Sequence, residues 1–171
     1  MVRRSKSLLI SVIGGSNANG EYLDLAYQVG QELARRGAIV VCGGLAGIMK
    51  SVCKGAKEAG GTTIGILPGN DPGEANPYVD LPICTGIGYA RNVIVVKSGR
   101  AVIAIDGAFG TLSEIGHALG DAIPVIGLRT WNISQDNKVA RYIIPANDPV
   151  DAVEKAIAAA RQRSSRKKRA K

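Results

Sequence analysis

The chain has 171 residues, of which 46% are apolar, and this composition supplies one domain with a sizeable core. Its longest uninterrupted apolar runs are five residues. A membrane helix needs about 20, so we expect no membrane segment. The three cysteines, Cys42, Cys53 and Cys84, are odd in number and lack CxxC spacing. They indicate reduced thiols in a cytoplasmic protein and argue against a disulfide scaffold or a zinc ribbon.

Positive charge is concentrated at the two ends of the chain. The formal net charge is +8, but residues 161–171 hold seven of the 22 basic residues and no acid, and residues 1–6 hold three more. Residues 7–160 then carry 12 basic and 14 acidic residues, a net charge of −2. We therefore predict a domain over residues 1–160 and a basic tail over residues 161–171. Such a tail is either solvated and disordered or in contact with nucleic acid, and its lack of aromatic residues favours the first alternative.

The apolar pattern alternates between strand and helix periods along the chain. Gly37 stops the first predicted helix, and Asp148 and Pro149 provide a cap and a first residue for the last one. In chain order we expect strand 8–15, helix 22–36, strand 38–44, helix 47–59, strand 62–69, a turn-rich loop 70–78, helix 91–97, strand 101–106, helix 110–120, strand 124–128, strand 141–144 and helix 147–161. Continuously apolar strands in this alternation predict an α/β fold, a single doubly wound Rossmann-like domain with a mostly parallel sheet covered by helices on both faces.

Three glycine clusters follow predicted strands, at the sheet edge where such folds bind their ligands. Glycine lets backbone N–H groups approach an anion closely, and a following helix N-terminus favours negative charge. A tight turn is the simpler explanation for any single cluster, but three at one edge favour an anionic, nucleotide-like ligand. The chain has neither a P-loop nor a GxGxxG motif, which argues against an ordinary ATPase or dehydrogenase. The candidate ligand-binding residues in these clusters are Gly14, Gly15, Ser16, Gly43, Gly44, Gly47, Gly107, Phe109, Gly110 and Thr111.

Two charged residues, Glu114 and Arg91, stand out near these clusters. Glu114 follows the third cluster by one helical turn, where a carboxylate can stabilise positive charge or position water. The alternative is a capping box, with Thr111 as N-cap and Glu114 as the third helical residue. Arg91 pairs with a phosphate, with Glu114 or with a purely structural partner. His117 stands three residues after Glu114, but a single such pair is a weak metal motif, and we predict no metal site.

Two segments resemble the signatures of the Lonely guy (LOG) family. Residues 43–49 are similar to its GGGxxGxM segment, and residues 106–114 are similar to its PGGxGTxxE signature. Arg91 precedes Asp106 by 15 residues, the spacing of the arginine in that family. The resemblance extends from about residue 8 to residue 160.

The LOG resemblance implies a phosphoribohydrolase, which splits the N-glycosidic bond of a nucleoside 5′-monophosphate and requires no cofactor. Carried over by position, Arg91 and Glu114 form the catalytic pair. The loop over residues 107–111, which includes Ala108, cradles the 5′-phosphate, and Met49 joins the ligand-binding residues. Glu114 then stabilises an oxocarbenium-like ribosyl centre or acts as a nucleophile.

Other details are similar to a sister branch that contains the molybdenum-cofactor carrier proteins. These details include the Arg91–Asn92 pair and the sequence GTLSEIGHAL. This resemblance implies that the molybdenum cofactor, a phosphorylated pterin, binds along the same loops without chemistry. Ala108 at the second glycine of the signature, Asp106 at its first position and Asn92 in place of a LOG lysine favour this alternative. Either branch implies a small phosphorylated ligand and a homodimer or homotetramer.

Overall fold

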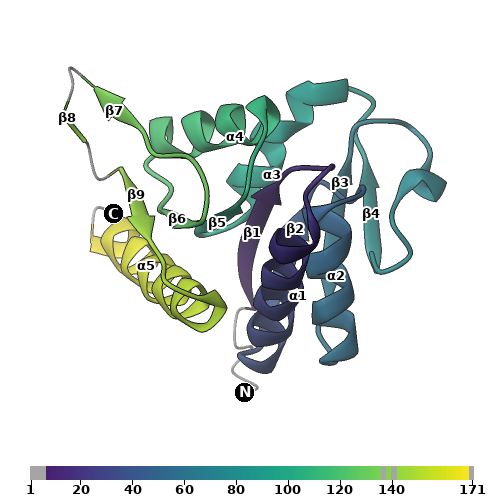
Figure 1. Ribbon diagram of the computed structural model, residues 1–171, viewed down its shortest axis with the longest axis horizontal. Coiled ribbons are helices and arrows are strands. Elements are labelled where there is room, and N and C mark those ends of the chain that lie inside the picture. Colours follow the sequence, from purple (N-terminus) through teal and green to yellow (C-terminus); the bar gives the residue numbers. More distant parts are fainter. Residues whose placement is uncertain (1–6, 136–137, 140–141, 170–171) are drawn as a thin grey trace.

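A seven-stranded sheet forms the centre of the protein (Figure 1). This computed structural model describes residues 7–135, 138–139 and 142–169, so the basic residues of the first six positions lie outside it. The strand order is β4-β3-β2-β1-β5-β6-β9, and every neighbouring pair is parallel. The strands are β1 (Leu8–Gly14), β2 (Ala38–Cys42), β3 (Thr63–Leu67), β4 (Leu81–Cys84), β5 (Val102–Ile105), β6 (Val125–Leu128) and β9 (Ile143–Pro145).

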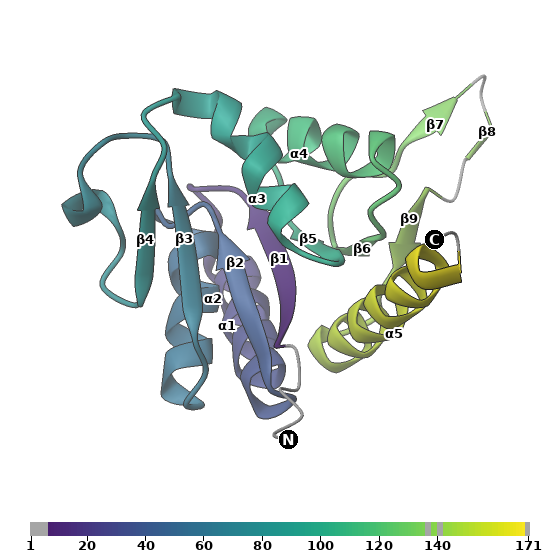
Figure 2. The same ribbon diagram turned by 180° about the vertical axis from the view of Figure 1, so that it is seen from behind.

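Helices cover both faces of this sheet, which Figures 1 and 2 show from opposite sides. One apolar core lies between the sheet and α1, α2 and α5, and a second lies between the sheet and α3 and α4. The predicted doubly wound Rossmann-like fold is therefore confirmed. The helices are α1 (Gly20–Arg35), α2 (Ile48–Glu58), α3 (Asn92–Ser98), α4 (Phe109–Gly120) and α5 (Pro149–Arg169), with 3₁₀ turns η1 (Pro72–Glu74) and η2 (Gly88–Arg91) and a small antiparallel pair β7 (Ser134–Gln135) and β8 (Lys138–Val139).

The central strands explain why continuously apolar runs form the sheet. All four residues of β5 and all four of β6 are buried, because helices cover both sides of these strands. The edge strand β4 is the opposite case, since all four of its residues are exposed. Its sequence, with Pro82 in the second position, carries no apolar run, and the sequence analysis missed it. Proline is tolerated there because β4 is paired on one side only.

The C-terminal helix differs from its prediction at one end. Asp148 caps it as expected, since its Oδ1 accepts a hydrogen bond from the backbone N–H of Asp151 at 2.9 Å. The predicted end at Arg161 is wrong, because α5 continues to Arg169. Residues 161–169 contain arginine, lysine and glutamine, which are good helix formers, and neither glycine nor proline. The described part of the basic tail is therefore helical, and residues 170–171 lie outside the described chain.

The strand order places a topological switch point between β1 and β5. From β1 the chain builds the sheet outward through β2 and β3 to β4, and then returns through η2 and α3 to place β5 on the other side of β1. Doubly wound sheets bind ligands in the crevice at the carboxyl ends of such strands. Among the described residues, no helix has both the length and the apolar character needed to cross a membrane.

Candidate functional site

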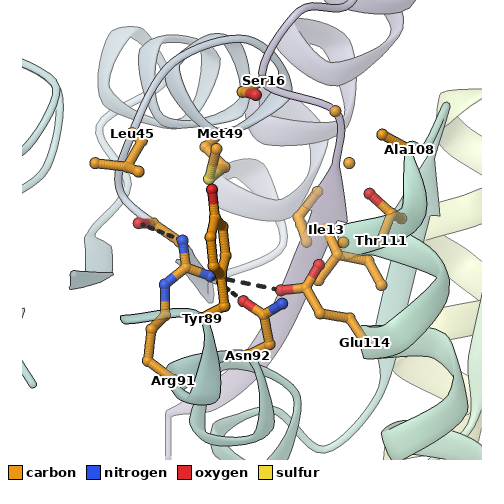
Figure 3. A pocket seen from close by; sticks show the side chains of 15 residues that line it. Ile13, Ser16, Leu45, Met49, Tyr89, Arg91, Asn92, Ala108, Thr111 and Glu114 are labelled. Atoms are coloured by element: carbon orange, nitrogen blue, oxygen red, sulfur yellow. Dashed lines mark hydrogen bonds and ion pairs between the residues drawn. The ribbon is translucent and has the colours of Figure 1, made fainter. Parts of the chain in front are cut away.

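A pocket of about 280 Å³ opens at this switch point (Figure 3). Its walls come from the last residues of β1, the loops after β1, β2 and β5, the segment before α3 and the first turns of α4. The lining residues are Val12, Ile13, Gly14, Gly15, Ser16, Gly43, Leu45, Met49, Tyr89, Arg91, Asn92, Ala108, Gly110, Thr111 and Glu114. The structure thus brings the three predicted glycine clusters together around one cavity.

Direct contacts hold these three loops against one another. The backbone N–H of Ile48, at the start of α2, donates to the carbonyl oxygen of Gly15 at 3.0 Å. Gly47 adopts a φ of +63° at this point, a conformation that side chains disfavour. On the other side of the β1 loop, a Cβ on Gly15 would lie 3.0 Å from Oδ2 of Asp106. The bends after β1, β2 and β5 therefore form one continuous edge.

Arg91 and Glu114 face each other inside the pocket (Figure 3). Both are buried, each with 6% of its surface exposed, and Nη1 of Arg91 lies 3.7 Å from Oε1 of Glu114. The same Nη1 donates to Oδ1 of Asn92 at 2.7 Å, and Nη2 donates to the carbonyl oxygen of Gly43 at 3.4 Å. Nε of Arg91 is buried and has no partner among the described residues. The guanidinium therefore keeps hydrogen-bonding capacity within the pocket wall.

Gly43 provides the space that Arg91 occupies. A Cβ at this position would lie 2.5 Å from Nη2 of Arg91 and 2.6 Å from Sδ of Met49. Any larger residue would displace the guanidinium or the methionine side chain. One glycine of the second cluster is thus required for packing against Arg91, in addition to the bend that it forms.

Burial changes the protonation of both charged groups. The pKa of the Glu114 carboxyl is raised from 4.5 to about 7, because burial removes it from water, and the nearby Arg91 guanidinium only partly opposes this shift. Burial also lowers the pKa of Arg91, while the Glu114 carboxylate acts to raise it. Glu114 can consequently hold or release a proton near neutral pH, as groups that act in acid–base chemistry do.

This shift makes a prediction about stability. Between pH 4.5 and 7 the folded protein keeps a proton on Glu114 that the unfolded chain has lost, so ionisation of Glu114 costs stability as pH rises. The variant Glu114→Gln lacks this cost. We compare the free energy of unfolding of Glu114→Gln with that of wild type at pH 4 and at pH 8. The difference, variant minus wild type, is expected to be about 3 kcal/mol larger at pH 8 than at pH 4. Urea unfolding at both pH values measures this difference, and a difference that does not change with pH would contradict the prediction.

Helix α4 begins earlier than the capping-box alternative required. Its N-cap is Ala108, whose side chain makes no capping hydrogen bond, and Thr111 is the third helical residue. The capping box is therefore wrong. The chain turns at Asp106 and Gly107, with φ angles of +54° and +147°, and this turn starts the helix at Phe109. The first N–H groups of α4 are left without a side-chain cap beside the pocket, an arrangement suited to an anion.

Four predicted ligand-binding residues do not line this pocket. Gly44 and Gly47 belong to the same segment as the lining residues Gly43, Leu45 and Met49 but are not among them. Phe109 is 81% exposed, and its ring centroid lies 6.0 Å from that of Trp131. Gly107 lines a second, more open hollow of about 270 Å³, together with Tyr22, Asp106, Arg129, Thr130 and Trp131. The remaining predicted residues, Gly14, Gly15, Ser16, Gly43, Met49, Ala108, Gly110, Thr111, Arg91 and Glu114, all line the pocket.

Five lining residues were not among the predicted site residues: Val12 and Ile13 of β1, and Leu45, Tyr89 and Asn92. Asn92, the first residue of α3, links this helix to α4, because its Nδ2 donates to Oγ of Ser113 at 3.4 Å. Its Oδ1 accepts the hydrogen bond from Arg91 described above. Tyr89 and Asn92 stand within two positions of Arg91 in the sequence. This proximity was the one indication that they line the same pocket. Leu45 follows the glycines of the second cluster and carried no indication of its own.

The Glu-x-x-His pattern does not form a joint site. Glu114 is buried and faces Arg91, whereas His117 is exposed on α4. Among the residues that the structure describes, no three His, Cys, Asp or Glu side chains are grouped closely enough to hold a metal ion. The polar side chains that line the pocket are the Glu114 carboxyl, the Arg91 guanidinium, the Asn92 amide and three hydroxyls, those of Ser16, Tyr89 and Thr111.

These features define a class, the Rossmann-type α/β proteins whose glycine-rich strand ends enclose a pocket with a buried arginine and glutamate. Residues 7–153 match the SLOG cluster4 family, and the chain belongs to it. An uncharacterized protein of Archaeoglobus fulgidus is 40% identical over 124 residues, which cover 72% of this chain and 82% of that protein.

Two further relatives carry different functions in their names. The cytokinin riboside 5′-monophosphate phosphoribohydrolase of Mycobacterium tuberculosis is 30% identical over 125 residues, which cover 68% of this chain and 67% of the enzyme. The chain spans about half the length of rice proteins named for this activity, 52% and 49%. The solved structure of the molybdenum cofactor binding protein from Rippkaea orientalis matches with a TM-score of 0.82 and 35% identity, over 90% of this chain and 98% of that one. The predicted membership of the LOG and molybdenum-cofactor carrier superfamily is confirmed.

Proposed function

We propose that this protein binds a phosphorylated, nucleotide-like ligand in the pocket at the β1–β5 switch point and hydrolyses the N-glycosidic bond of a nucleoside 5′-monophosphate. The observation that carries the proposal is Glu114, a buried carboxyl with a pKa of about 7 in an open pocket, 3.7 Å from Arg91 and beside an uncapped helix start. The similarity to a named phosphoribohydrolase supports it.

Each part of the pocket has a role in this reaction. The N–H groups at the start of α4 hold the 5′-phosphate, helped by the helix dipole. Glu114, ionised, lies against the ribose and stabilises positive charge at its anomeric carbon as the bond to the base breaks. Water adds to that carbon, and the base leaves with a proton. Arg91 positions the carboxylate and, with its free Nε, contributes a further donor within the wall.

A second candidate function is binding of the molybdenum cofactor without catalysis. It is favoured by the match to the Rippkaea orientalis protein, which extends over nearly the whole of both chains. Two features of the site fit it. Ala108 and Asp106 depart from the glycine-rich loop of the LOG signature, and Asn92 engages Arg91 directly. The uncapped start of α4 suits the phosphate of a phosphorylated pterin equally well.

Incubation with AMP and with N6-substituted AMP separates the two functions. The hydrolase releases free base and ribose 5-phosphate, which chromatography detects. Failure of the well-folded protein to release base at high concentration would reject the hydrolase, and pterin fluorescence or molybdenum that copurifies with the protein would identify the carrier. The homodimer or homotetramer implied by the resemblance stays a prediction, and light scattering measures it.

A further inference from the structure

Two aromatic side chains are unusually exposed beside the pocket. Tyr89 is 87% exposed and Phe109 is 81% exposed, whereas no other large apolar side chain among those described exceeds the 53% of Leu81. An aromatic ring that stays in water does not contribute the favourable free energy of burying its apolar surface. Such exposure therefore indicates a surface that contacts a ligand or a partner. Only Tyr89 lines the pocket, and it therefore concerns the ligand directly.

The backbone around Tyr89 places its ring at the pocket. Tyr89 lies in the η2 turn, between Gly88, with a φ of +58°, and the segment that leads to Arg91. In Figure 3 the ring rises across the pocket, with its hydroxyl end in the direction of Met49. The Tyr89 side chain makes no hydrogen bond or ion pair with any described residue, and at 87% exposure most of its surface is open to a ligand.

Two apolar side chains of the pocket lie near the Tyr89 ring. Leu45 and Met49, from the loop after β2 and the start of α2, share the pocket with the Tyr89 ring. Figure 3 shows Leu45 and Met49 near the hydroxyl end of the Tyr89 ring, and Thr111 and Glu114 farther to the right. Thr111 and Glu114 provide polar groups suited to a phosphate and a sugar, while Leu45 and Met49 provide apolar surface beside the Tyr89 ring. A planar ring attached to a phosphorylated sugar or chain matches both sets of residues at once.

We propose that Tyr89 stacks on a planar heteroaromatic ring of the ligand and holds it against Leu45 and Met49. This inference rests on the proposed function and names its ligand class, a phosphorylated compound with a flat heterocycle such as a purine or a pterin. Stacking uses the face of a ring and is tolerant of its edge substituents. The heterocycle of the ligand is therefore required for tight binding, whereas Tyr89, Leu45 and Met49 discriminate only weakly between its edge substituents.

The test compares ligands with and without a ring by calorimetric titration. The probes are carbocyclic AMP, which has no N-glycosidic bond for the proposed reaction to split, neopterin monophosphate and ribose 5-phosphate. The variants are Tyr89→Ala, Tyr89→Phe and Tyr89→Leu. Loss of one base-stacking contact is expected to weaken binding of carbocyclic AMP or of neopterin monophosphate to Tyr89→Ala by roughly 5-fold to 100-fold. Ribose 5-phosphate, which has no aromatic heterocycle, is expected to bind Tyr89→Ala as it binds wild type. Tyr89→Phe restores the affinity because it keeps the ring, whereas Tyr89→Leu, which is apolar but not planar, restores it incompletely.

Tyr142→Ala is the matched control, because Tyr142 is another exposed tyrosine that does not line the pocket. It lies next to β9, at one edge of the sheet. Equal weakening of all three probes, or none, in Tyr89→Ala would overturn the inference. A change in molar mass by light scattering without a change in affinity would also overturn it, and would assign Tyr89 to a contact between copies of the chain. If wild type binds ribose 5-phosphate as tightly as the two probes that carry a heterocycle, the stacking inference is wrong but the proposed function stands. If wild type binds none of the three probes, both the stacking inference and the proposed function are wrong.

Discussion

Replacement of Glu114 by glutamine is expected to reduce the release of free base from a nucleoside 5′-monophosphate by about 100-fold to 10,000-fold. Glutamine has the same shape as glutamate but cannot become negatively charged. It keeps the packing beside Arg91 and removes the charge that stabilises the ribosyl centre. Base release at saturating substrate, followed by chromatography, measures the effect. Circular dichroism spectra of the variant and wild type establish that both are folded.

The pH dependence provides an independent check on this role. Because the pKa of Glu114 is about 7, wild-type activity is expected to increase as pH rises through 7 and the carboxylate forms. Glu154→Gln is the control, since this glutamate is exposed on α5 and pairs with Arg36. It should retain wild-type activity at every pH. Undiminished base release by Glu114→Gln would show that Glu114 does not act in the reaction.

Replacement of Gly30 by alanine is expected to destabilise the protein by about 3 kcal/mol. Helices α1 and α2 pack backbone to backbone at this point. A Cβ on Gly30 would overlap the carbonyl oxygen of Val52 and would lie 2.8 Å from the backbone nitrogen of Ala56. Neither backbone atom can move away alone, so the helices must separate and lose their apolar contacts. Urea unfolding followed by circular dichroism measures the loss.

Gly116→Ala is the control for this change. Gly116 lies in the interior of α4, and no atom lies within 4 Å of the position that its Cβ would take. The same substitution is expected to stabilise the protein there by about 0.5–1 kcal/mol, because alanine is the better helix former. If the Gly30→Ala protein were as stable to urea as the Gly116→Ala protein, that result would contradict the backbone contact between α1 and α2.

The alternation of strands and helices was predictable because it is a local property. The continuously apolar run in β5 and the helical spacing in α1 are visible within a few residues, and each corresponds to its predicted element. Strand β4 was not predictable, because its residues are exposed and it is a strand only through its pairing with β3. The predicted helix 110–120 begins one residue after α4, and only the capping-box alternative misplaced the N-cap, since the turn at Asp106 depends on a φ angle that the sequence does not reveal.

The candidate site was predictable in part. Glu114 was identified from its spacing after the third glycine cluster, and the rules of parallel sheets placed the clusters at one edge. The resemblance to the LOG family paired Glu114 with Arg91. Asn92 and Tyr89 stood next to Arg91 in sequence, but nothing local distinguished a buried amide that binds the guanidinium from an aromatic ring left in water. That distinction depends on which segments cover each side chain.

The sequence by itself determined the class of fold, the three glycine bends and the identity of the two charged residues, because period, chain direction and residue type are properties of neighbouring positions. Only the tertiary structure decided that Arg91 and Glu114 lie 3.7 Å apart and that Tyr89 stands open to solvent beside them. The physical reason is that burial and charge interaction are sums over all surrounding atoms. Those atoms come from β1, α2 and α4, which are brought together only when the sheet has formed.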